Sequence, residues 1–147
     1  MTVQRSAKAT RLFGWLLAAA VAGLCLGLYP LLEWYQTLRP LGLHAAAAIF
    51  FGYYLCVPAV LTALWNMDRL LGNILRGRVF VEENVRRIGR VCWCCAVVAV
   101  ISLAAGWFYQ PLLFLTAIMA FLSLTVSVVR SVMGAAVRMR EENDLTV

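Results

Sequence analysis

The side chains best suited to chemistry in this sequence are its five cysteines. Cys92 and Cys95 have the CxxC spacing of thiol–disulfide enzymes. Such enzymes need accessible thiols that face an oxidising compartment, whereas these two fall on consecutive helical turns at the arginine-rich end of an apolar stretch. Cys25 and Cys56 lie within apolar stretches. The pattern therefore favours cysteine as a small membrane residue over a membrane redox enzyme.

The remaining candidates for chemistry are few. His44 is the only histidine, and zinc would need further His or Cys ligands beside it. It could sense pH, but only Glu33 lies near it to titrate with it, so an interfacial histidine is the preferred interpretation. The apolar stretches hold no carboxylate for proton coupling, and no phosphate-binding loop or nucleophile elbow is present. We expect no enzyme activity, no cofactor and no metal.

Four apolar stretches dominate the chain. Hydrophobic residues make up 63% of it and charged residues 14%, which excludes an ordinary soluble domain and a disordered chain. A helix needs about 20 apolar residues to cross a bilayer. The stretches that qualify are 12–32, 43–65, 91–109 and 112–129. Their apolar runs are continuous, without the alternation of barrel strands, so the sequence predicts an all-α, integral membrane four-helix bundle forming a single membrane domain over 1–147.

Basic residues lie on one side of these predicted spans. Residues 1–11, 66–90 and 130–147 carry twelve of the thirteen Lys and Arg, and Arg39 stands alone on the other side. The positive-inside rule then places both termini and the central loop in the cytoplasm. The net charge of +6 is thus a topology signal, and the expected partner is the lipid bilayer rather than nucleic acid. The first span resembles a signal peptide near Ala20, but its length favours an uncleaved anchor.

Small residues recur at four-residue spacing inside the spans, as membrane helix interfaces require. The pattern could form a homodimer seam or a polar permeation pathway, but packing within the bundle is the preferred interpretation. Pro58 interrupts the second span and predicts a kink. The small-residue pairs and series are Gly23/Gly27, Ala48/Gly52, Ser102/Gly106 and Ser123/Ser127/Ser131.

The segment between the second and third spans, residues 66–90, is called the elbow below. Its first half has apolar residues on one helical face, from Met67 to Leu75, and predicts a short cytoplasmic amphipathic helix. Gly77 permits a turn, and a second helix is expected to start near Glu82 and run into the third span. The elbow is either an interfacial connection without a partner or a docking surface. The tail, residues 130–147, ends in an acidic cluster that could pair with elbow arginines.

Short motifs in the elbow and tail resemble a known family. Gly77, Phe80, Glu83 and Asn84 are followed by Arg86-Arg87-Ile88-Gly89, and the chain ends Glu-Asn-Asp-Leu-Thr-Val. This pattern is similar to the YoaS-like family of small bacterial membrane proteins, domain of unknown function 2975, whose members have four spans and a cytoplasmic middle loop. Family members often have Ser or Thr where this chain has Val81. The resemblance implies a membrane partner for a small helix-turn-helix regulator and carries over no catalytic residue.

Together these observations predict a non-enzymatic regulatory protein of the bacterial cytoplasmic (inner) membrane, whose cytoplasmic face binds a partner such as a helix-turn-helix transcription regulator. The alternative is a small oligomeric transporter or channel subunit, and a homo-oligomer is a possible state for either. The candidate partner-binding residues are Arg76, Phe80, Glu83, Asn84, Arg86, Arg87, Glu142, Asp144 and Thr146.

Overall fold

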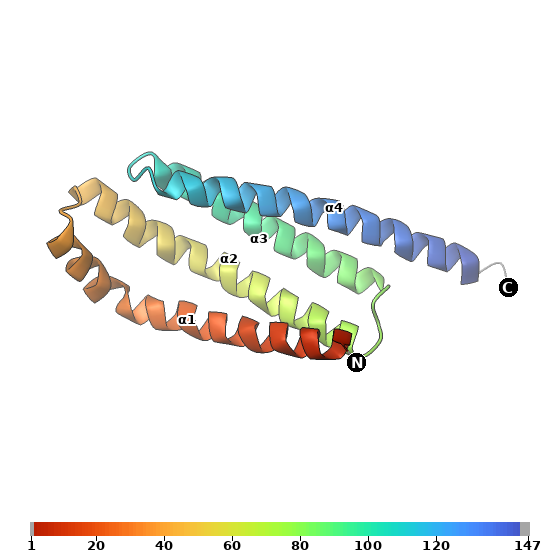
Figure 1. Ribbon diagram of the computed structural model, residues 1–147. Helices are drawn as coiled ribbons and strands as arrows, with labels where there is room; N and C mark the ends of the chain where they lie inside the picture. The colour runs from red at the N-terminus through yellow and green to blue at the C-terminus, as the bar shows by residue number, and fades with distance from the viewer. Residues whose placement is uncertain (1, 145–147) are drawn as a thin grey trace.

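Four long helices form the molecule (Figure 1). The computed structural model describes the backbone of residues 2–144 and the side chains of residues 8–143. The helices are α1 (Thr2–Leu38), α2 (Leu43–Leu75), α3 (Glu82–Gly106) and α4 (Leu112–Asp144). Each is long and apolar enough to cross a membrane, and the described residues contain no strand. The predicted all-α architecture with four spans is confirmed.

The helices contact one another in chain order. Within the described residues α1 packs on α2, α2 on α3 and α3 on α4, and no other pair of helices makes a comparable contact. The helices run alternately up and down, so the N-terminus, the loop between α2 and α3, and the C-terminal end of α4 lie at the same end of the molecule (Figure 1). The two most extensive helix–helix contacts are those of α3 with α2 and with α4, so α3 supplies most of the buried residues, including Ile88, Val98 and Ala99.

Small residues explain the close contact of α2 with α3. A methyl group on Gly52 would lie 3.5 Å from Cβ of Ala105, and Ser102, which lines the same cavity as Gly52, is buried, whereas Gly106 contacts Leu113. Gly23 differs, because nothing lies within 4 Å of the position its Cβ would take. Packing within the chain therefore accounts for the pairs on α2 and α3, but not for the glycines of α1.

The cysteine and serine of the α3–α4 interface bond to each other. The Ser123 hydroxyl donates to the Cys92 carbonyl at 3.2 Å, and the Cys92 thiol lies 3.3 Å from the Ser123 carbonyl that accepts from it. Further along α4, the Ser131 hydroxyl donates to the carbonyl of Ser127 on its own helix. Interhelical hydrogen bonds such as those between Cys92 and Ser123 contribute about 0.6 kcal/mol each in a membrane. Ser123, Ser131 and Cys92 thus have structural partners.

The separate amphipathic helix predicted for the first half of the elbow is not found. Residues 66–75 are the last turns of α2, which runs unbroken from Leu43 to Leu75. Extending a helix adds a hydrogen bond per residue without a new nucleation cost, and no strong breaker separates the apolar span from the amphipathic segment. α2 also stays helical through Pro58. The visible bend lies in the last third of α1, the part that contains Pro30 (Figure 1).

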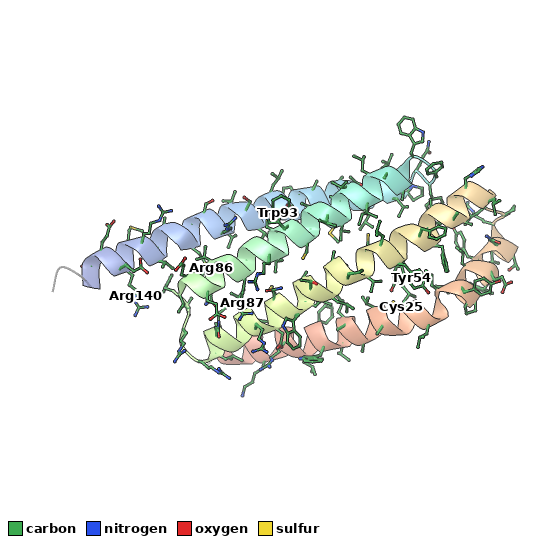
Figure 2. All side chains as sticks on the ribbon, turned by 180° about the vertical axis from the view of Figure 1, so that it is seen from behind. Cys25, Tyr54, Arg86, Arg87, Trp93 and Arg140 are labelled. Atoms are coloured by element: carbon green, nitrogen blue, oxygen red, sulfur yellow. The ribbon has the colours of Figure 1, made fainter. Side chains whose placement is uncertain are left out.

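Polar contacts fasten α1 to α2 at two depths. In the middle of the molecule, the Tyr53 hydroxyl donates to the Val21 carbonyl at 2.9 Å, and the Tyr54 hydroxyl donates to the Cys25 carbonyl at 2.6 Å. Figure 2 shows Tyr54 on α2 opposite Cys25 on α1. Near the arginine-rich end, Arg11 on α1 forms a salt bridge with Asp68 on α2.

Candidate functional site

The linker loop, residues 76–81, joins α2 to α3 and carries Gly77 and Phe80 of the motif found in the sequence. α2 ends in a Schellman motif: the Gly77 amide donates to the Ile74 carbonyl at 3.0 Å, and the Arg78 amide donates to the Asn73 carbonyl at 3.0 Å. Gly77 has φ of +75°, a left-handed conformation that costs residues with a Cβ about 1–2 kcal/mol. The glycine of the motif is therefore a helix stop that turns the chain toward α3.

Replacement of this glycine gives a first prediction. Gly77→Ala is expected to lower the free energy of unfolding by about 1 kcal/mol, because alanine must adopt the left-handed conformation, although nothing crowds the new methyl group. Denaturation of the protein in mixed micelles measures this change. Gly72→Ala, at a helical glycine of α2 that is also uncrowded, is the matched control and should raise stability slightly. Equal effects at both positions would contradict the assignment.

Asn84 holds the linker loop from the first turn of α3. Its side chain is fully buried, and its amide nitrogen donates to the carbonyls of Arg78 at 2.8 Å and Val79 at 2.9 Å. Its side-chain oxygen accepts from Nδ2 of Asn73 on α2, also at 2.8 Å. One side chain thus bonds to two loop carbonyls and to the preceding helix. This explains an asparagine at the position, since it needs both donors and an acceptor.

The start of α3 lacks a side-chain cap and carries ion pairs instead. Val81 occupies the N-cap in an extended conformation without a capping bond, as expected for a residue with no side-chain oxygen. Glu82 and Glu83 in the first turn complement the helix dipole. Arg86 pairs with Glu82 at 2.9 Å, and Arg87 pairs with Glu83.

The two arginines have different surroundings. Figure 2 shows Arg87 on the side of α3 that faces α2, where its side chain is 17% exposed, while Arg86 is 70% exposed. The hydrogen bond from Arg87 lowers the pKa of the Glu83 carboxyl, which lies in the elbow outside the apolar span, and the charges of Arg87, Arg69 and Arg90 add to the effect. The Nε atom of Arg87 is buried and has no hydrogen-bond partner among the described residues. Arg87 is thus a semi-buried cation, and Arg86 a surface one.

An apolar surface accompanies these charges. Phe80 is 46% exposed and Val81 is 37% exposed, at the point where the linker loop enters α3. Arg76 and Arg78 in the same loop are exposed as well. An aromatic side chain on a backbone fixed by hydrogen bonds, with arginines around it, has the composition of a protein-binding hot spot.

The structure brings together six of the nine candidate residues, those of the elbow, whereas Glu142 and the backbone of Asp144 lie apart from them at the end of α4. α4 extends beyond the level at which α3 begins, and Arg140 lies on this extension (Figure 2). Glu142 is exposed near its end. Asp144 is the last residue with a described backbone, and Thr146 lies outside the described residues. The tail therefore forms a second surface at the same end of the molecule.

Sequence reasoning missed the partners that support the elbow. Asn73 was not singled out, although it lies four residues before the glycine that stops α2 and bonds to Asn84. Gly89 was taken only as part of a motif. A methyl group there would lie 3.0 Å from Nε of Arg130, so the glycine makes room for an α4 side chain against α3. The presence of Gly89 in the motif was the signal in the sequence that could have indicated this contact with Arg130.

Comparison with known protein families gives a match over most of the chain. The family described as Protein of unknown function (DUF2975) matches residues 27–147. The chain belongs to this family. The matched residues cover the end of α1 and all of α2, α3, α4 and the elbow, and so include Gly77 and Asn84. No curated protein and no solved structure matches the chain.

Proposed function

We propose that this DUF2975 protein is a non-enzymatic regulatory protein of the bacterial cytoplasmic membrane whose elbow binds a cytoplasmic partner protein. The observation that carries the proposal is the rigid presentation of Phe80 beside exposed arginines. A surface fixed before binding loses little conformational entropy when a partner docks, and the exposed half of an aromatic side chain gains from burial. Arg76, Phe80 and Arg86 make the contact surface, while Asn84 and Arg87 position it.

The topology of the proposal follows from charge. The N-terminus, the elbow and the end of α4 lie at one end of the molecule, and the sequence segments there hold nearly all the basic residues. The positive-inside rule supports a cytoplasmic location for that end. The partner type comes from the family resemblance, which points to a small helix-turn-helix regulator. A regulator held there would be near the membrane and away from DNA.

The transporter alternative has weaker support. A polar permeation pathway would need side chains free to contact a solute. The Ser123 hydroxyl is instead bonded to the Cys92 carbonyl, and the Ser131 hydroxyl to the Ser127 carbonyl. The hydroxyls of Ser123 and Ser131 are thus used between and within helices.

Photocrosslinking tests the proposed surface. Phe80 is replaced by p-benzoylphenylalanine, and intact cells of the native host are irradiated. We expect a discrete adduct with one soluble protein, identified by mass spectrometry, because position 80 is exposed at the proposed contact. The matched control is the same replacement at Trp107, an aromatic residue that is 88% exposed at the opposite end of the molecule.

The two positions separate binding from general reactivity. An adduct at position 80 that is absent at position 107 supports the elbow as the contact surface. The absence of a protein adduct at position 80, or the same adduct at both positions, would show that the elbow is not the docking site.

A further inference from the structure

A groove between α1 and α2 lies near the arginine-rich end of the molecule. Its volume is about 250 Å³, and small side chains on α1 leave the space. The deeper wall of the groove is apolar. Two of its lining residues are Trp15 and Trp65, and tryptophan side chains favour the membrane–water interface. The groove thus runs from the interface into the apolar depth of the membrane. Its principal lining residues are Gly14, Trp15, Ala18, Leu61, Leu64 and Trp65.

The mouth of the groove contains a fixed arginine. Nε of Arg11 donates to Oδ1 of Asp68 at 2.6 Å, and Nη2 donates to Oδ2 at 3.3 Å. The Trp15 indole donates to the same Oδ1 at 3.3 Å. The contacts therefore occupy both oxygens of the carboxylate. A guanidinium has five N–H donors, so Arg11 keeps donors that can point toward a ligand.

A second arginine makes the mouth positive. The guanidinium carbon of Arg69 lies 5.1 Å from the centre of the Trp65 ring, a cation–π contact that holds the charge above a wall of the groove. The salt bridges of the described residues give Arg69 no carboxylate partner, since Asp68 pairs with Arg11 and Glu83 pairs with Arg87. The charge of Arg69 also acts on Glu83, whose pKa it lowers, but no carboxylate of the described residues lies within salt-bridge distance of it. Since Asp68 neutralises Arg11, Arg69 supplies the net positive charge beside a groove whose interior is apolar.

We propose that this groove is a binding site for an anionic phospholipid of the adjacent leaflet, with an acyl chain between α1 and α2 and its phosphate at Arg11 and Arg69. The positive charge at the mouth favours an anionic headgroup, and the apolar wall favours contact with an acyl chain. Zwitterionic lipids would gain the apolar contact without the net attraction. The site is separate from the proposed partner surface, because Arg76, Phe80 and Arg86 do not line it.

Quenching by brominated lipids tests this assignment. A variant with Phe at Trp34, Trp93 and Trp107 keeps Trp15 and Trp65, the two tryptophans of the groove. The protein is reconstituted in the same mixture of phosphatidylglycerol and phosphatidylcholine twice. In one sample only the phosphatidylglycerol is brominated, and in the other only the phosphatidylcholine is brominated. An arginine at a membrane surface contributes roughly a five-fold preference for an anionic lipid, so we expect at least that preference for phosphatidylglycerol.

Two variants determine whether the preference arises in the groove. Arg69→Gln should abolish it, whereas Arg140→Gln, which removes an exposed arginine of α4, should leave it unchanged. Gly14→Leu should reduce quenching by either lipid, since the position has open space and the leucine would fill the groove. Equal quenching by the two lipids in the parent, a preference that survives in Arg69→Gln, or undiminished quenching in Gly14→Leu would each overturn the proposal.

Discussion

Asn84→Ala is expected to lower the free energy of unfolding by about 2–4 kcal/mol, the largest loss for any elbow substitution. The residue is fully buried, and its removal leaves the Arg78 and Val79 carbonyls and the Asn73 amide without their partner. Buried polar groups without partners cost more than the bonds themselves contribute. Denaturation in mixed micelles measures the global loss.

Trypsin gives a local measurement of the same substitution, because it cleaves after arginine and the linker loop contains Arg76 and Arg78. If the substitution lowers the free energy needed to open the linker loop by about 1.4 kcal/mol or more, cleavage there should become about tenfold faster or more. Asn73→Ala is the control, since it removes one of the three bonds and should cost about 1 kcal/mol. If Asn73→Ala were as damaging as Asn84→Ala, the two loop carbonyls would not depend on Asn84.

Much of the fold could be predicted because the bilayer imposes a simple rule. Uninterrupted apolar stretches of about 20 residues must be helices in lipid, so four helices followed directly from the sequence. Acidic residues at Glu82 and Glu83 indicated the start of α3, and Gly77 indicated the turn. These features depend on local chemistry, which a single sequence contains.

The errors and omissions concern contacts between segments. The end of α2 was predicted as a separate helix because its polar face suggested a new environment, but a helix does not stop where the membrane does. Asn84 was a candidate contact residue because it belongs to the motif that resembles the family. Its burial depends on Asn73 across the interface, a pairing that the spacing of the two residues does not reveal. Candidate residues thus divide into those that present a surface and those that hold it.

Gly106→Val should destabilise the opposite end of the molecule by about 1–3 kcal/mol. α3 ends at Gly106, and the chain returns through a tight turn in which the Tyr109 amide donates to the Ala105 carbonyl at 3.1 Å. A Cβ at position 106 would lie 2.6 Å from Cδ2 of Leu113 and 3.4 Å from its backbone nitrogen. The leucine tip must move, and Cγ of Leu113 at 3.1 Å must also give way, whereas its backbone nitrogen is at the limit of ordinary contact.

Unfolding measurements on three variants test this clash. Gly23→Val is the matched control, because the Cβ at position 23 has open space and should cost little. Combining Gly106→Val with Leu113→Ala should recover part of the loss, since the shorter side chain relieves the closest contacts. An additive double variant would mean that the loss comes from the backbone of the turn rather than from the leucine.

Comparing Gly106→Val with Asn84→Ala separates stability from partner binding. Both variants lose stability, but Gly106 lies at the far end of the molecule from the linker loop (Figure 1). If Asn84 positions the partner surface, crosslinking at position 80 should fall in Asn84→Ala and persist in Gly106→Val under conditions where both remain folded. Equal losses in the two variants would assign the effect to general destabilisation. A loss confined to Asn84→Ala would mean that the elbow must be held rigid for the partner to bind, since only that substitution releases the loop that carries Phe80.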